Sequence, residues 1–190
     1  MDANAAAKTV DHVSAVRRRV RRRLSSFWFP LLVFGGLTLG SLVIIALANG
    51  PALGVYWTVA GTVGGTATGR HYRRQERELG LEARQAASIV VCAAIVVGCL
   101  LAGGIAGGLE AERTAAIGPS LVVAAGYAIF AWLDRSAALA AIGALLGGLT
   151  LAVALSDLDA TATAFVLALA YGVVGVVAGL VFRALEQRSL

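Results

Sequence analysis

Apolar residues along this chain gather into six blocks, and charged residues are confined to the segments between them. The blocks cover about 27–48, 51–69, 87–109, 114–133, 136–156 and 160–182. Each block is apolar on all sides, whereas strands of a membrane barrel alternate apolar and polar residues with a period of two. A helix needs about 20 apolar residues to cross a hydrocarbon core of about 30 Å. The pattern therefore predicts an all-α integral membrane protein, a bundle of six transmembrane helices.

The segments outside these blocks divide the rest of the chain. Residues 1–26 form a basic tail whose valines and Leu24 share one helical face, which is typical of a helix lying on a membrane surface. Residues 27–182 form the transmembrane domain, and 183–190 form a second short tail. The first apolar block is longer than the core of a signal peptide, and further spans follow it. We therefore expect an uncleaved first helix.

Lysine and arginine are distributed unequally between the two sides of the predicted bundle. Fifteen of the 16 lie in the basic tail, in 70–86, at Arg135 or after residue 182, and Arg113 alone lies on the other side. Cytoplasmic segments are the ones enriched in these residues, so both termini are predicted to be cytoplasmic. The block at 51–69 is rich in Gly and Thr, yet it must cross the membrane, since otherwise the arginines of 70–86 would lie outside.

The fourth block leaves one structural question open. Pro119 follows Gly118 inside the apolar run. Proline removes a backbone donor from a helix and either kinks the helix or marks its first turn. The helix therefore either starts near Thr114 and bends at Pro119, or starts at Pro119 and is short.

Ionisable residues are missing from the interior of the apolar blocks. Of all residues 58% are hydrophobic and only 14% are charged. Pumps, ion-coupled carriers and membrane hydrolases commonly use intramembrane ionisable groups. His12 and His71 have no neighbouring ligands in the sequence, and Asp157 and Asp159 are loop acids. We therefore expect no catalytic residues, no metal and no cofactor. A membrane enzyme is the less favoured interpretation, because only loop acids are available to it, and the question of enzymatic activity stays open.

Glycines spaced four residues apart are the clearest motif. Such spacing lets helix backbones approach closely in a membrane. The candidate packing residues are Gly36, Gly40, Gly61, Gly65, Gly69, Gly103, Gly107, Gly143, Gly147, Gly175 and Gly179. They fit either a tightly packed single bundle or a homo-oligomer formed through one stripe. The helix at 51–69 carries a double stripe and is expected to be the most enclosed.

Three threonines of the same helix form a candidate polar path. Thr58, Thr62 and Thr66 share one face, and Tyr171 in the sixth block needs a hydrogen-bond partner if it is buried. One of the threonines is expected to supply that partner. Alternatively, their hydroxyls bond to carbonyl groups four residues back in their own helix.

Two clusters of arginine are candidate docking sites for lipid headgroups or for a protein partner. They comprise Arg17, Arg18, Arg19, Arg21, Arg22, Arg23, Arg70, Arg73, Arg74 and Arg77. Arginine near an anionic leaflet contributes about 1 kcal/mol per residue to membrane binding. The lipid bilayer with its anionic inner leaflet is therefore an expected partner, and a membrane or cytoplasmic protein is a second. The basic tail has neither interleaved aromatic residues nor a nucleic-acid-binding fold, so no nucleic-acid partner is expected.

One resemblance rests on short motifs in the first third of the chain. At Phe29-Pro30, Gly35, Tyr56-Trp57 and Arg70-His71-Tyr72-Arg73-Arg74 the chain resembles small uncharacterised membrane proteins of high-GC actinobacteria. The resemblance covers about residues 20–75. It implies a multi-pass protein of the bacterial inner (plasma) membrane and supplies no activity.

Two functions remain after these exclusions. The favoured interpretation is a non-catalytic accessory or regulatory subunit that acts through helix packing and a basic cytoplasmic face. The alternative is a small uncoupled permease or lipid-handling protein that uses the polar face of the helix at 51–69.

Overall fold

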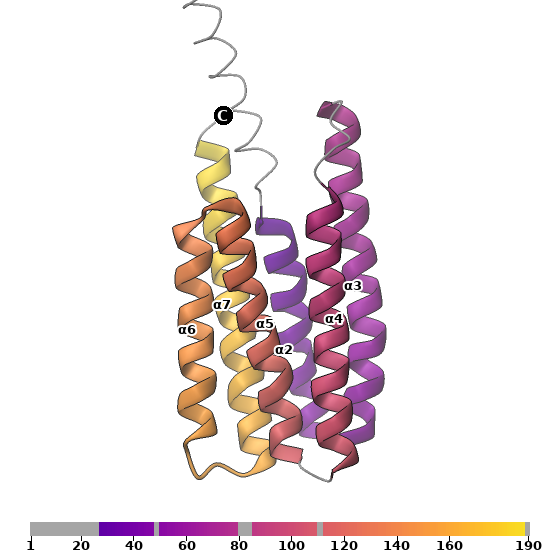
Figure 1. Ribbon diagram of the computed structural model, residues 1–190, viewed down its shortest axis with the longest axis vertical. Helices are drawn as coiled ribbons and strands as arrows, with labels where there is room; N and C mark the ends of the chain where they lie inside the picture. Colours follow the sequence, from indigo (N-terminus) through magenta and orange to yellow (C-terminus); the bar gives the residue numbers. More distant parts are fainter. Residues whose placement is uncertain (1–26, 48–49, 80–84, 110–111, 189–190) are drawn as a thin grey trace, which may run out of the picture.

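A computed structural model describes residues 27–47, 50–79, 85–109 and 112–188 of the chain. These residues form a bundle of α-helices that run alternately up and down (Figure 1). The helices are α2 (Trp28–Leu47), α3 (Gly50–Leu79), α4 (Gln85–Gly108), α5 (Glu112–Asp134), α6 (Ala137–Ala154) and α7 (Ala160–Arg188). The predicted all-α fold is thus confirmed for the described residues, and the basic tail at 1–26 lies outside them.

Four of these helices are long and apolar enough to cross a membrane, namely α2, α5, α6 and α7. In α4 the apolar stretch Val90–Ala106 is shorter. Helix α3 is the least hydrophobic of all, because its Gly and Thr residues contribute little apolar surface and its last turns carry arginine. The described chain therefore has four helices suited to crossing a membrane, and α3 and α4 are the least suited of the six.

Two helices extend beyond the apolar blocks, and one passes through proline. Helix α3 continues to Leu79, so the charged segment that follows 51–69 begins as helix, and α7 continues to Arg188. Helix α5 contains Pro119 in its interior. The alternative in which this helix begins at Pro119 is therefore wrong. Proline is tolerated there because packing against neighbouring helices offsets one missing backbone hydrogen bond.

The most extensive contact in the bundle joins the first and last described helices, α2 and α7. Their backbones touch, since the buried Gly35 of α2 lies against Gly172 and Gly175 of α7. One turn away, Gly179 of α7 lies against Leu32 of α2. A Cβ atom placed on Gly175 would lie 3.0 Å from the Cα atom of Gly35. Small residues at such a crossing let dispersion forces act over the whole interface, which matters in lipid because no hydrophobic drive brings helices together.

Helix α5 is the centre of the other half of the bundle. It packs on α4, α6 and α7, while α3 packs on α2 (Figure 1). The side chains buried between these helices include small ones, such as Ala124 and Ala131, and larger ones, such as Leu139 and Leu146. The bundle thus has α2, α5, α6 and α7 as its core, with α3 and α4 added to its sides.

Candidate functional site

Helix α3 presents a face that no other part of the described chain covers. Cβ atoms placed on Gly61, Gly65 and Gly69 would meet no atom within 4 Å outside their own helix. Gly64, one position away, faces α2, where an added Cβ would lie 2.8 Å from a methyl carbon of Leu37. The expectation that this helix is the most enclosed is therefore wrong. The glycine stripe lies on the outer surface because α3 uses its other face to contact α2.

The threonines of α3 also lie on its exposed surface. The Thr58 hydroxyl donates to the Gly54 carbonyl at 2.9 Å, and the Thr62 hydroxyl donates to the Thr58 carbonyl at 2.7 Å. Both bonds stay within α3, as expected from the alternative in which the threonine hydroxyls bond to carbonyl groups four residues back. Thr66 is exposed on the same helix. The three side chains are therefore not gathered around Tyr171.

Tyr171 joins α7 to two other helices instead. Its hydroxyl, on α7, donates to the Ser120 carbonyl of α5 at 2.7 Å and lies 2.9 Å from the Thr150 hydroxyl of α6. Thr150 is fully buried and also donates to the Leu146 carbonyl at 2.8 Å. The expectation of a threonine partner from the helix at 51–69 is wrong, because α5 and α6 lie against α7 at this height.

Replacing Tyr171 with Phe is expected to lower the free energy of unfolding by about 1 kcal/mol, because hydrogen bonds between membrane helices contribute about that much. Detergent-induced unfolding followed by circular dichroism measures the change. Thr62→Val is the matched control, since it removes a hydroxyl whose bond lies within one helix. Equal effects of the two substitutions would show that Tyr171 does not link the helices.

The other candidate packing glycines fall into two groups. Added Cβ atoms on Gly40, Gly103, Gly143, Gly147, Gly175 and Gly179 would each meet a neighbouring helix within 4 Å. Gly36 faces open space, and for Gly107 the structure describes only the helical backbone. Contacts as close or closer occur at glycines outside that list, namely Gly126, Gly172 and Gly35, and at Gly35 the nearest atoms belong to the backbone of α7. A search that allows three-residue steps as well as four-residue steps finds Gly172 beside Gly175 and Gly179.

Basic and aromatic residues meet at the end of the bundle where α2 begins and α3 and α7 end (Figure 1). The His71 ring stacks on Phe29 at 4.1 Å, and the Arg183 guanidinium lies 5.2 Å from the centre of the Trp28 ring. Burial lowers the pKa of His71, while the charge of Glu186 opposes this shift. The folded protein therefore favours the neutral imidazole of His71. The contribution of His71 to stability is greatest above the usual histidine pKa and decreases as the pH falls through the lowered pKa of His71.

The candidate docking arginines are placed only in part. Arg70, Arg73 and Arg74 are exposed at the same end of the bundle. For Arg77 the structure describes the helical backbone alone, and the arginines of the tail lie outside the described residues. The exposed members are therefore available to lipid headgroups or to a protein.

The opposite end of the bundle carries one arginine with a structural role that sequence reasoning did not anticipate. Arg113, in the first turn of α5, donates from one guanidinium nitrogen to the carbonyl groups of Val153 at 3.0 Å, Ala154 at 3.3 Å and Ser156. Val153 and Ala154 end α6, where carbonyl groups lack partners within the helix, and Ser156 lies just beyond it. The Val153 carbonyl also accepts from the backbone N–H and the hydroxyl of Ser156. The only signal in the sequence is the isolation of Arg113 on its side of the membrane.

The loop acids have no site around them in the described residues. The Asp159 carboxylate accepts a hydrogen bond from the backbone N–H of Ala162 at 2.6 Å and so caps the start of α7. Among the described residues no three His, Cys, Asp or Glu side chains are close enough to hold a metal ion.

Comparison with known proteins adds nothing to the interpretation of these surfaces. No protein-family model, no curated protein and no solved structure matches the chain. The resemblance to actinobacterial membrane proteins therefore stays a prediction, and function has to be argued from the surfaces described above.

Proposed function

We propose that the chain is a six-span protein of the bacterial inner membrane, with both termini cytoplasmic, and that it acts as a non-catalytic accessory or regulatory subunit. The contact surface in this proposal is the outer face of α3, defined by Gly61, Gly65 and Gly69. The observation that carries the proposal is that this face is uncovered in the described chain, although it has the residues of a helix-packing surface.

Hydropathy supports a protein partner for this surface. A helix facing lipid is stabilised by apolar side chains, whereas the glycine stripe of α3 and the threonines beside it offer little apolar surface. The exposed apolar side chains of this helix include Val55, Val59 and Val63. Contact with a second helix is favourable at such a surface, because small residues allow close approach of the two backbones. The exposed part of α3 is therefore more stable when covered by another helix than when facing lipid.

The arrangement of charge supports the proposed orientation. The helices alternate in direction, so Arg70, Arg73, Arg135 and Arg183 lie at one end of the bundle and Arg113 lies at the other (Figure 1). Enrichment of arginine at a single end is what the positive-inside rule associates with the cytoplasmic side. In this orientation the basic end also faces the anionic inner leaflet and any acidic cytoplasmic partner.

The threonines of α3 do not support the permease alternative. A polar path needs side chains that offer hydrogen bonds to a substrate, yet the Thr58 and Thr62 hydroxyls donate to carbonyls of their own helix. They also lie on the outside of the bundle, away from Tyr171. The subunit interpretation is therefore the better supported of the two.

Purification in mild detergent from cells with near-native expression tests the proposal. We expect the wild-type protein to be isolated in a stoichiometric complex, with another protein or with a second copy. The substitution Gly65→Leu should remove the partner, because a leucine side chain on the stripe keeps the backbones apart. Gly148→Leu on α6 is the matched control, since Gly148 also has open space around it but lies outside α3. A wild-type protein isolated as a monomer, or an equal loss in both variants, would contradict the proposal.

A further inference from the structure

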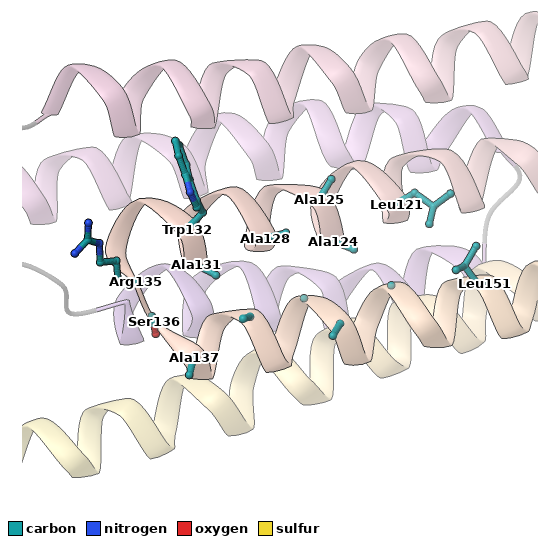
Figure 2. Close-up of a pocket in the computed structure, with 14 residues that line it drawn as sticks. Leu121, Ala124, Ala125, Ala128, Ala131, Trp132, Arg135, Ser136, Ala137 and Leu151 are labelled. Atoms are coloured by element: carbon teal, nitrogen blue, oxygen red, sulfur yellow. The ribbon is translucent and has the colours of Figure 1, made fainter.

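A groove runs along the outer surface between α5 and α6 (Figure 2). Its volume is about 630 Å³, and its floor consists largely of alanine and glycine, among them Ala124, Ala128, Ala140, Gly143 and Gly147. The small side chains leave a channel because the two helices cannot fill the space between them. Such an apolar channel is open to the hydrocarbon chains of the surrounding membrane.

The two ends of the groove differ in chemistry. Arg135 and Ser136 lie at one end together with Trp132, whereas Leu121 and Leu151 lie at the other (Figure 2). From Leu121 to Arg135 helix α5 rises about 21 Å. One leaflet of the hydrocarbon core is about 15 Å thick. The groove is therefore long enough to hold one acyl chain over the thickness of a leaflet and to leave its charged end at headgroup level.

Arg135 occupies a backbone position that favours glycine. Its φ angle is 52°, in the left-handed region, and the backbone N–H of Ser136 donates to the Ala131 carbonyl at 2.9 Å. This bond is typical of a helix that ends with glycine in the left-handed position. A residue with a side chain costs about 1–2 kcal/mol there. An outlier of this kind is a reason to look for a function of the side chain.

We propose that this groove binds one anionic phospholipid, with its phosphate at the Arg135 guanidinium and one acyl chain along the Ala and Gly floor. Guanidinium binds phosphate through two parallel hydrogen bonds. The Ser136 hydroxyl accepts a bond from the Leu139 N–H at 3.4 Å and keeps its own proton to donate. Trp132, with 79% of its surface exposed beside this end, is of the residue type that marks headgroup level in membranes.

Charge complementarity decides between a lipid and a helix as the occupant. A helix from a second copy would fit the small-residue floor equally well but would place no defined anion at Arg135. A zwitterionic phospholipid also has a phosphate, but its own ammonium group pairs with that phosphate, so the net charge that it offers the guanidinium is smaller than that of an anionic phospholipid. An anionic phospholipid matches both the charged end of the groove and its apolar floor. This site is separate from the outer face of α3.

Native mass spectrometry of the full-length protein tests the proposal, with phosphatidylglycerol and phosphatidylcholine of the same acyl chains as probes. We expect one bound phosphatidylglycerol, with an affinity on the order of tenfold above that of phosphatidylcholine, which is the size of one hydrogen bond to a charged group. Arg135→Gly should remove this preference without lowering the unfolding midpoint, because glycine suits the left-handed position. Arg188→Gln is the charge control, since Arg188 is exposed at the same end but outside the groove.

A second pair of variants tests the acyl chain. Ala144→Phe fills the groove and should weaken binding of both lipids, whereas Ala138→Phe, on an exposed face of α6 away from the groove, should not. An equal effect of Arg188→Gln and Arg135→Gly, or of the two alanine substitutions, would overturn the proposal. So would an Ala144→Phe variant that changes from dimer to monomer with unchanged lipid binding, since a second copy would then occupy the groove.

Discussion

Replacing Gly35 with Ala is expected to cost about 1–3 kcal/mol of stability, the usual range for overpacking a close-packed interior. The added Cβ atom would lie 2.7 Å from the backbone nitrogen of Val176 and 2.9 Å from the carbonyl carbon of Gly175. Both are backbone atoms of α7, so no side-chain rotation relieves the contact. Helices α2 and α7 have to separate along the most extensive interface of the bundle. Detergent-induced unfolding measures the loss.

The neighbouring glycine gives an unusually close control. A Cβ atom on Gly36 meets nothing within 4 Å, and alanine is a better helix former than glycine. Gly36→Ala should therefore leave stability unchanged or raise it. If Gly35→Ala is as well tolerated as Gly36→Ala, the α2–α7 contact described here is not the one in the membrane.

Replacing Arg113 with Ala is expected to lower the free energy of unfolding by about 2–3 kcal/mol, the upper part of the range for hydrogen bonds to a charged group. The substitution leaves the carbonyls of Val153, Ala154 and Ser156 without the guanidinium. It also removes a positive charge from the C-terminal end of α6, where the helix dipole favours cations. Thermal unfolding followed by circular dichroism measures the effect.

Two further variants separate the charge from the geometry. Arg113→Lys keeps the charge without the planar fork, so it should recover only part of the lost stability. Glu112→Gln changes an exposed charge next to it and should have little effect. An Arg113→Ala protein as stable as Glu112→Gln would show that Arg113 does not hold the end of α6.

The positions of the helices could be predicted from the sequence, because helix formation here depends on local runs of apolar residues. Runs of apolar residues between charged segments predict membrane helices wherever the chain is placed, and the described residues do form helices at each of the six blocks. The exceptions have local causes too. Helix α3 continues past its apolar block because the residues after Gly69 are good helix formers. The crossing of α3 and α4 remains a proposal, since their hydropathy is the weakest.

Which faces meet was beyond the sequence, because that depends on residues of different helices. Four-residue spacing singled out Gly36, which faces open space, whereas Gly35 beside it makes the close contact, since its partner Gly175 lies on α7. Tyr171 was assigned a partner from the helix at 51–69, and its neighbours are instead Ser120 and Thr150. A pattern within one helix cannot specify which other helix faces it.

The same limit explains why the sequence wrongly predicted α3 to be the most enclosed helix. Small residues on a helix indicate close packing, but they do not say whether the partner belongs to the same chain. In the described chain α2 meets α3 at Gly64, and the stripe at Gly61, Gly65 and Gly69 is left open. The glycine stripe of α3, which in the sequence indicates an enclosed helix, is therefore proposed as an interaction surface.

The proposed six-span topology and the proposed contact surface on α3 both depend on α3 crossing the membrane with its arginines on the cytoplasmic side. The direct measurement is labelling of single cysteines by a membrane-impermeant maleimide, in the full chain with Cys92 and Cys99 replaced by alanine. Ala52→Cys and Arg73→Cys place an exposed residue at each end of α3. The cysteine at 52 should react in intact cells, and the one at 73 only after permeabilisation. If both positions react in intact cells, or both only after permeabilisation, α3 does not cross the membrane and the six-span account is wrong.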